Sequence, residues 1–198
     1  MLAVIFDTET TGLTKNRTVK LEMQPEIIEI YATLYDLKKG KKVKELRPFR
    51  KMPKAEAHFG YLIKPTKALL DKPLPGDKKT ITQITGITNK DLENAPPFTE
   101  VSGQIFSFLK QAPVVIAHNA SFDREMIDIE AERIKHTVEW PKVLCTVEQT
   151  IHMKGFRLSL SNLHQELFNE PFAGAHRAKI DVMALVRCCV ELAKRKIL

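Results

Sequence analysis

Residues Val4–Leu13 read VIFDTETTGL and contain the transition on which the fold depends. The apolar run Leu2–Phe6 is typical of a strand that is covered on both faces of its sheet, and it ends abruptly at Asp7 and Glu9. Residues two apart in a strand point to the same side, roughly 6–7 Å from each other along the chain. The sequence therefore predicts a buried strand whose end projects both carboxylates from one face.

A pair of neighbouring carboxylates repels itself unless a cation or a proton lies between the two groups. Mg²⁺ and Mn²⁺ prefer hard oxygen ligands of this kind, so Asp7 and Glu9 are compatible with a metal site. A solvated strand end, followed by a turn at Thr10–Gly12, explains the same residues. The pair alone leaves both interpretations open.

The other apolar runs predict an order in which strands come first, helices and strands then alternate, and helices come last. Ser121 is a candidate N-cap for one of the helices, and residues 65–86 are rich in Pro and Gly and read as a loop. This order favours an α/β domain with three layers around a central mixed sheet. The expected strands are Leu2–Asp7, Gln24–Leu37, Phe59–Pro65, Val114–Ala117 and Lys142–Thr146, and the expected helices are Phe98–Lys110, Ser121–Ile134, Leu158–Phe168 and Lys179–Ala193.

Length and composition predict a single globular domain. The chain has 198 residues, of which 43% are hydrophobic and 28% charged. It contains no apolar stretch of membrane-spanning length, its start does not resemble a signal peptide, and its three cysteines form no paired framework. We therefore expect one domain over residues 1–198, with a basic insertion at about 38–58, in a soluble cytoplasmic protein with reduced thiols and no membrane partner.

The basic excess of the chain is concentrated in one segment. The net charge is +7, and residues 38–54 alone carry +8, because Glu45 is their only acidic residue. Such a cluster can bind nucleic-acid phosphates through counterion release, but it can equally be a solvated hairpin. The candidate backbone-binding residues are Lys38, Lys39, Lys41, Lys42, Lys44, Arg47, Arg50, Lys51 and Lys54.

Two further polar clusters follow predicted element ends. His118 and Asn119 follow the strand Val114–Ala117, and Asp123 falls in the first turn of the next helix; these residues could also simply tie down a loop and support the helix start. His176 and Asp181 are five residues apart, which on one helix would place them roughly 140° from each other. They can converge only if His176 lies in the loop before the helix.

The three motifs together carry a resemblance to a known family. FDTETTGL from Phe6, HNASFD from His118 and HRAKID from His176, in this order, resemble the exonuclease motifs of the DEDD superfamily, in its histidine-bearing DnaQ-like branch. Members include the proofreading ε subunit of bacterial DNA polymerase III, ribonuclease T and oligoribonuclease. The tyrosine branch has Tyr where this chain has Arg177, which indicates the histidine branch. The resemblance implies a ribonuclease H-like fold.

Site residues follow from that resemblance. It implies that Asp7, Glu9, Asp123 and Asp181 bind two Mg²⁺ or Mn²⁺ ions and that His176 is the general base. A histidine must be neutral to accept a proton, so activity should rise towards mildly alkaline pH. The segment QITGIT, residues 83–88, resembles the part of the family that packs on the last nucleotide. The implied substrate contacts are Thr8, Thr11, Leu13, Ile84, His118, Asn119 and Phe122.

The implied function is metal-dependent 3′–5′ hydrolysis of single-stranded or frayed DNA ends to 5′-mononucleotides, in proofreading, repair or DNA degradation. An exoribonuclease of the oligoribonuclease or ribonuclease T type is the alternative, because one sequence does not reveal whether a 2′-hydroxyl is tolerated. An inactive nucleic-acid-binding module is a remote alternative, against which the intact set of five motif residues argues. Association with a polymerase stays an open expectation.

Overall fold

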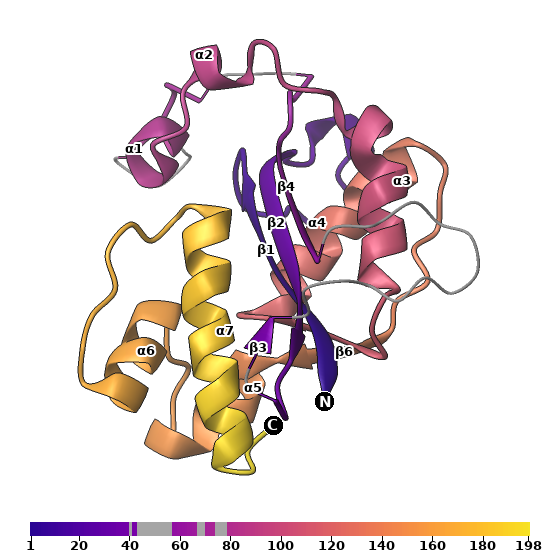
Figure 1. The fold of residues 1–198 in the computed structure, drawn as a ribbon. Helices are drawn as coiled ribbons and strands as arrows, with labels where there is room; N and C mark the ends of the chain where they lie inside the picture. Colours follow the sequence, from indigo (N-terminus) through magenta and orange to yellow (C-terminus); the bar gives the residue numbers. More distant parts are fainter. Residues whose placement is uncertain (40, 43–56, 67–69, 74–78) are drawn as a thin grey trace.

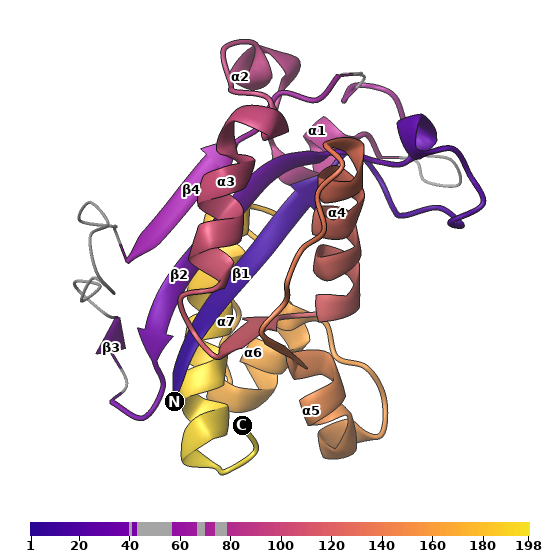
Figure 2. The same cartoon turned by 90° about the vertical axis from the view of Figure 1, so that its right-hand side faces the viewer.

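The fold is built around β1 (Leu2–Thr10), which is covered on both faces in the computed structural model. Val4 and Phe6 pack against α3 (Phe98–Leu109) and α4 (Ala120–Arg133), whereas Ala3 and Ile5 pack against α7 (Ala178–Lys194). Figure 1 shows the sheet between these two helical layers, and Figure 2 shows α3 and α4 in front of β1 with α7 behind. Burial on both faces explains the uninterrupted apolar run at the start of the chain.

The structure describes residues 1–39, 41–42, 57–66, 70–73 and 79–198. Within them the sheet is six-stranded and mixed, in the order β3-β2-β1-β5-β6, with β4 also paired to β2. β2 runs antiparallel to β1, and β5 and β6 run parallel to it. The other elements are η1 (Leu21–Met23), β2 (Ile27–Asp36), β3 (Lys41–Lys42), β4 (His58–Leu62), α1 (Ile81–Thr85), α2 (Asn89–Leu92), β5 (Val114–Ala117), β6 (Lys142–Cys145), α5 (Thr146–Lys154) and α6 (Leu160–Phe168).

Several predicted boundaries are wrong. β1 does not end at Asp7 but continues to Thr10, because β2 pairs with it up to Thr10, across a β-bulge after Glu9. The N-cap of α4 is Asn119, in a left-handed backbone conformation, rather than Ser121, and the helix starts earlier than predicted. α1, α2 and α5 were not predicted as helices: α1 lies in the stretch that reads as a loop, α2 has only four residues, and the end of β6 leads directly into α5.

The basic segment is described only at its start. Lys38 and Lys39 are exposed in the turn after β2, and Lys41–Lys42 form β3, which pairs with Tyr35 and Asp36. The other five candidate residues lie outside the described part of the chain: Lys44, Arg47, Arg50, Lys51 and Lys54. Among the helices that the structure describes, none is long and apolar enough to cross a membrane.

Candidate active site

Three carboxylates converge where β1 meets the start of α7. One ligand oxygen from each of Asp7, Glu9 and Asp181 lies within 4.8 Å of the others. The strand alternation that sends Ala3 and Ile5 towards α7 sends Asp7 and Glu9 the same way, and Asp181 lies in the first turn of that helix. The predicted common face of the two β1 carboxylates is thus confirmed, although the strand continues past Glu9 instead of ending at Asp7.

Asp123 joins the cluster through Thr8. The parallel pairing of β5 with β1 stops at Ile5, so the N–H of Thr8 on that edge has no strand to bond with. Asp123, only 2% exposed, takes the place of that strand. Its Oδ1 accepts bonds from the Thr8 backbone N–H at 3.0 Å and from Thr8 Oγ1 at 2.8 Å. The missing strand neighbour therefore places the fourth carboxylate beside β1.

All four carboxyl groups hold their protons more tightly than usual. Burial, followed by the charges of Asp123 and Glu9, raises the pKa of Asp7 well above its ordinary value. Burial and the charge of Asp181 raise the pKa of Glu9 to about 8. Burial also raises the pKa of Asp123 to about 7, although the bonds from Thr8 act in the opposite direction. Burial likewise raises the pKa of Asp181. Crowded, buried oxygen ligands of this kind fit divalent cations.

His176 lies in the loop before α7, as the spacing to Asp181 predicted. Its backbone is in the left-handed region, with φ of 69°, and its N–H donates to Asp181 Oδ2 at 2.7 Å. A left-handed conformation is uncommon for residues other than glycine, with asparagine, aspartate and histidine the most frequent exceptions, and it occurs often at functional sites. The side chain is exposed at the rim of the carboxylate cluster. A proton that it accepted could therefore pass to solvent.

His118 and Asn119 form structural contacts at the end of β5. The His118 ring lies 2.9 Å from Thr146 Oγ1 and 3.0 Å from the carbonyl oxygen of Leu158, one contact for each ring nitrogen. Burial lowers the pKa of His118 to about 4, so the ring is neutral at ordinary pH. Asn119 Oδ1 accepts a bond from Arg157 at 2.6 Å. Both side chains fasten the segment after α5 to the strand end.

The remaining predicted substrate contacts differ in what they offer to a ligand. Thr11 is bound to the residue before β2, because its N–H donates to the carbonyl oxygen of Glu26 and its Oγ1 accepts from the Glu26 N–H, both at 2.9 Å. Phe122 is half-buried against the main core. Leu13 is 75% exposed, and Ile84 in α1 is partly exposed. Leu13 and Ile84 therefore present the apolar surface that could contact a base.

Glu29 is the site residue that sequence reasoning missed. It lies in β2 directly opposite Glu9 and is 8% exposed. Its charge contributes to the raised pKa values of Asp7, Glu9 and Asp181. The signal was present, because a glutamate in the middle of the apolar run IIEIYA needs a partner. A single sequence could not show that the partner would be Arg177, far away in the chain.

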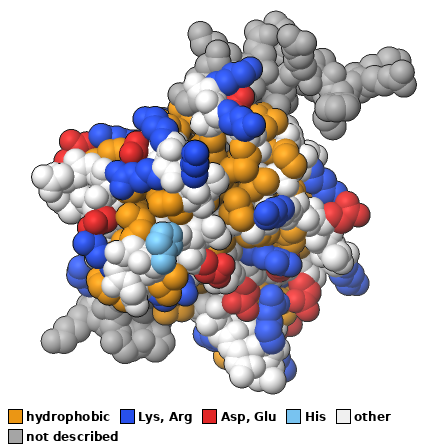
Figure 3. All heavy atoms as spheres, turned by 90° about the horizontal axis from the view of Figure 1, so that it is seen from below, with side chains coloured by type: hydrophobic (Ala, Val, Ile, Leu, Met, Phe, Trp, Pro, Cys, Tyr) orange, Lys and Arg blue, Asp and Glu red, His pale blue; other side chains and the backbone are white. Residues whose placement is uncertain are grey.

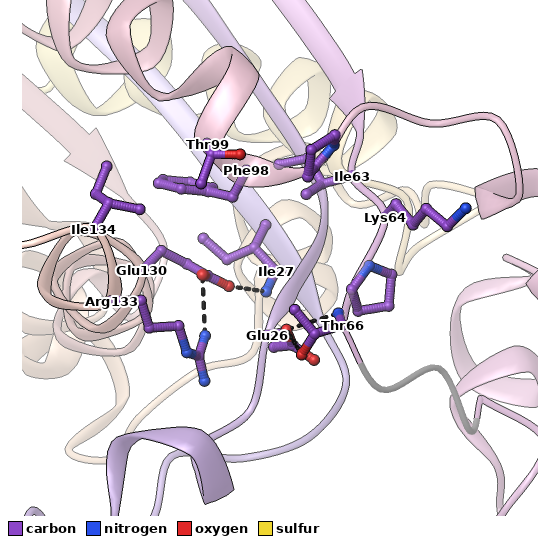
Figure 4. Close-up of a pocket in the computed structure, with 12 residues that line it drawn as sticks. Glu26, Ile27, Ile63, Lys64, Thr66, Phe98, Thr99, Glu130, Arg133 and Ile134 are labelled. Atoms are coloured by element: carbon purple, nitrogen blue, oxygen red, sulfur yellow. Dashed lines mark hydrogen bonds and ion pairs between the residues drawn. The ribbon is translucent and has the colours of Figure 1, made fainter.

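A pocket of about 150 Å³ lies elsewhere, between the start of β2, the segment after β4, and the helices α3 and α4 (Figure 4). Its charged groups are engaged with one another and with the backbone. Glu130 accepts a bond from the Ile27 N–H at 2.9 Å and pairs with Arg133 at 3.0 Å, and Glu26 accepts two bonds from Thr66. None of the four cluster carboxylates lines this pocket. Its residues stabilise the entry into β2 rather than form the candidate site.

Comparison with known proteins agrees with this geometry. A family model described as Exonuclease matches residues 4–188, which include all the cluster residues.

The chain belongs to this exonuclease family.

Relatives of this exonuclease chain include bacterial DNA polymerase III proteins. It is 33% identical over 191 residues to the ε subunit of DNA polymerase III of Treponema pallidum, covering 94% of this chain and 72% of the subunit. It is 29% identical over 196 residues to the PolC-type DNA polymerase III of Caldanaerobacter subterraneus subsp. tengcongensis, covering 97% of this chain. The match spans only 12% of that polymerase.

Solved structures show the same fold at low sequence identity. The nuclease domain of 3′hExo, described as a DEDDh family member bound to rAMP, has a TM-score of 0.68 at 14% identity, covering 98% of this exonuclease and 92% of that chain. Exonuclease X in complex with 5′ overhanging duplex DNA has a TM-score of 0.61 at 22% identity, with coverage of 98% and 92%. The expected α/β, ribonuclease H-like fold is confirmed.

Proposed function

We propose that this exonuclease removes nucleotides one at a time from the 3′ end of single-stranded or frayed DNA and releases 5′-mononucleotides. The observation that carries the proposal is the convergence of Asp7, Glu9 and Asp181 within 4.8 Å, with Asp123 bound beside them. Two Mg²⁺ or Mn²⁺ ions held by these four residues would lower the pKa of the attacking water and offset the charge that builds on the phosphate.

The chain's own residues supply the remaining parts of the reaction. His176, exposed beside Asp181, is the proposed base that takes the proton from the attacking water. Leu13 and Ile84 are proposed to hold the last base between apolar side chains, which requires a single-stranded or frayed end. The charged start of the basic segment at Lys38 and Lys39, exposed after β2, is proposed to contact phosphates further along the strand.

We propose DNA rather than RNA as the substrate because of the DNA polymerase III relatives. The ε subunit and the PolC-type enzyme are components of DNA polymerase III, and the chain matches them over more than nine-tenths of its length. RNA is the second candidate, because 3′hExo was solved with rAMP and shares the fold over 98% of this chain. The two substrates differ at the last sugar, where a 2′-hydroxyl is either accepted or excluded.

Matched DNA and RNA oligonucleotides of one sequence, labelled at the 5′ or at the 3′ end, test the proposal in Mg²⁺ or Mn²⁺. The 5′-labelled DNA should shorten one nucleotide at a time, and the 3′-labelled DNA should release a labelled mononucleotide in the first turnover. DNA should be degraded faster than RNA. Faster cleavage of RNA would reassign the substrate, and internal cleavage or loss from the 5′ end would contradict the proposed reaction.

A further inference from the structure

The charge of Glu29 is unfavourable beside the carboxylate cluster. It lies opposite Glu9 across the β1–β2 ladder and is 8% exposed. Like charges directly opposite each other destabilise a sheet, and a buried carboxylate without a partner is costly. A β-bulge follows Glu9, so the regular register of the two strands is interrupted next to this pair. Glu29 therefore needs a cation of its own.

Arg177 supplies that cation from the loop before α7. Its Nη2 donates to Glu29 Oε1 at 2.9 Å and its Nε donates to Oε2 at 3.1 Å, which is the two-point geometry of a strong arginine–carboxylate pair. The N–H of the next residue, Ala178, also donates to Glu29 Oε2, at 2.9 Å. Glu29 thus binds one side chain and one backbone group at the start of α7.

The same turn also binds the carboxylate cluster, through Asp181. The N–H groups of His176 and Arg177 donate to Asp181 Oδ2 at 2.7 and 3.1 Å. Three consecutive backbone N–H groups are therefore held by two carboxylates, one from the sheet and one from the cluster. The position of the proposed base relative to β1 is determined by this arrangement.

We propose that Glu29 and Arg177 are a positioning pair for the exonuclease site. The pair fixes the turn that carries His176 and Asp181 against β1, and it keeps the Glu29 carboxylate occupied so that cations bind to the four cluster carboxylates alone. This inference rests on the proposed function, because it assumes that the cluster binds divalent cations.

Electrostatics supports the proposal that Arg177 keeps the Glu29 carboxylate from competing for cations. The charge of Glu29 raises the pKa of Asp7, Glu9 and Asp181, whereas the charge of Arg177 lowers the pKa of Glu9. Without Arg177, Glu29 would be a fifth carboxylate without a cation at the edge of the cluster. Loss of Arg177 alone should therefore be more harmful than loss of both charges together.

The test compares Arg177→Gln, Glu29→Gln and the double variant with wild type. Arg187→Gln is the matched control, because Arg187 lies in α7, which Arg177 precedes, and likewise pairs with a glutamate, Glu170, that is not part of the cluster. The measurements are Mn²⁺ affinity by calorimetry, kcat and KM on one oligonucleotide, and hydrogen exchange of the amides of residues 176–178. If Arg177→Gln does not fold, Arg177→Lys keeps the charge, loses the two-point contact and serves in its place.

Arg177→Gln should lower Mn²⁺ affinity and kcat by about 10–100-fold, the usual effect of losing a group that orients metal ligands. KM should stay within a few-fold, and the amides of residues 176–178 should exchange faster. The double variant should lie closer to wild type in Mn²⁺ affinity than Arg177→Gln does. Arg187→Gln should leave all these quantities unchanged.

Two results would overturn the inference: wild-type Mn²⁺ affinity and amide protection in Arg177→Gln, or equal losses in Arg177→Gln and Arg187→Gln. Calorimetry and exchange do not require turnover, so they separate this inference from the proposed function. If Mn²⁺ affinity and amide exchange change in the variants as predicted, but wild type degrades no nucleic acid, the proposed function is refuted and the positioning pair is still supported.

Discussion

At the scale of single residues, the chemistry of the site follows from four buried or half-buried carboxyl groups, whose charged forms are unfavourable when no cation is bound. Glu9 and Asp123 have pKa values of about 8 and about 7, and those of Asp7 and Asp181 are also raised. In the folded chain these groups keep protons that they would lose in the unfolded chain. The folded state therefore binds more protons than the unfolded state, so the stability of the fold decreases as pH rises through the raised pKa values.

The stability of the metal-free protein should therefore decrease between about pH 6.5 and pH 9. His118 does not interfere, because its pKa of about 4 confines its own effect to lower pH. Thermal unfolding in EDTA measures the decline, and added Mg²⁺ should raise the melting temperature more at the upper end of the range than at the lower end. Asp7→Asn should flatten the decline and reduce the Mg²⁺ effect. A melting temperature that rises with pH in EDTA would show that these carboxyls are charged in the folded chain.

His176 combines a strained backbone with the proposed role of base. A left-handed conformation costs a non-glycine residue about 1–2 kcal/mol, and here the turn is held by bonds from backbone N–H groups to Asp181. We expect His176→Gly to melt at or above the temperature of His176→Ala, since glycine adopts this conformation without strain. Both variants should slow turnover by roughly 10²–10⁴-fold with little change in KM. Turnover within a few-fold of wild type would show that another group is the base.

At the scale of elements, the link between β1 and α4 decides where Asp123 lies. Thr8, which the family resemblance implied as a substrate contact, uses both its N–H and its hydroxyl to bind Asp123. Thr8→Val keeps the shape and the N–H bond but removes the hydroxyl. We expect kcat to fall by about 10-fold or more with KM unchanged, and Thr8→Ser to restore kcat, because serine keeps the hydroxyl. A raised KM with normal kcat would instead make Thr8 a substrate contact.

The sequence predicts the bounds of an element well where a local pattern sets them, and poorly where pairing with another strand sets them. The β5 strand was predicted with its observed bounds because four apolar residues lie between Pro113 and a polar pair. β1 was predicted too short, because its last residues are held by pairing with β2 and not by their own apolar character. Ser121 has the chemistry of an N-cap, but the chain turns earlier, at Asn119, whose backbone is left-handed.

The candidate site was predicted in part for the same reason. Asp7, Glu9 and Asp181 converge as expected, since strand alternation and helix-start position are local properties. Glu29 and Arg177 were not assigned a joint role, because their contact joins residues far apart in the chain. His118 carried a motif signal, yet its ring contacts show an anchor for the segment after α5.

At the scale of the whole molecule, charge is distributed unevenly. The face seen in Figure 3, where both termini lie in Figure 1, carries interspersed basic and acidic side chains among its described residues. The carboxylate cluster lies towards the other end of β1, since the strand starts near the N-terminus and Glu9 is close to its end. The segment of residues 38–54 starts near the N-terminal end of β1, since Asp36 pairs with Leu2, and its net charge of +8 is the proposed source of long-range attraction for a long strand.

Replacement of Lys38, Lys39, Lys41 and Lys42 by Gln should raise KM for a long single strand and leave a dinucleotide unaffected. Turnover at saturation should not change, because contacts with distant phosphates bind the substrate and the transition state alike. The slope of log K against log salt should flatten by about 0.7 for each lost phosphate contact. The matched control replaces Lys135, Lys142, Lys194 and Lys196, which are exposed and lie outside this segment. Equal salt slopes in the two quadruple variants would leave the segment without a role in substrate binding.

The central claim, that the carboxylate cluster removes nucleotides from a 3′ end, is tested most directly by single-turnover digestion of a 5′-labelled DNA strand by wild type, Asp7→Asn and Asp181→Asn. Each protein is first stripped with EDTA and then given Mg²⁺ or Mn²⁺, and circular dichroism and melting temperature confirm that each is folded. We predict a ladder that shortens from the 3′ end for wild type only after metal is added, and no shortening by either folded variant. Wild-type rates in Asp7→Asn or Asp181→Asn, or a full ladder in EDTA, would contradict the assignment of this cluster as the catalytic site.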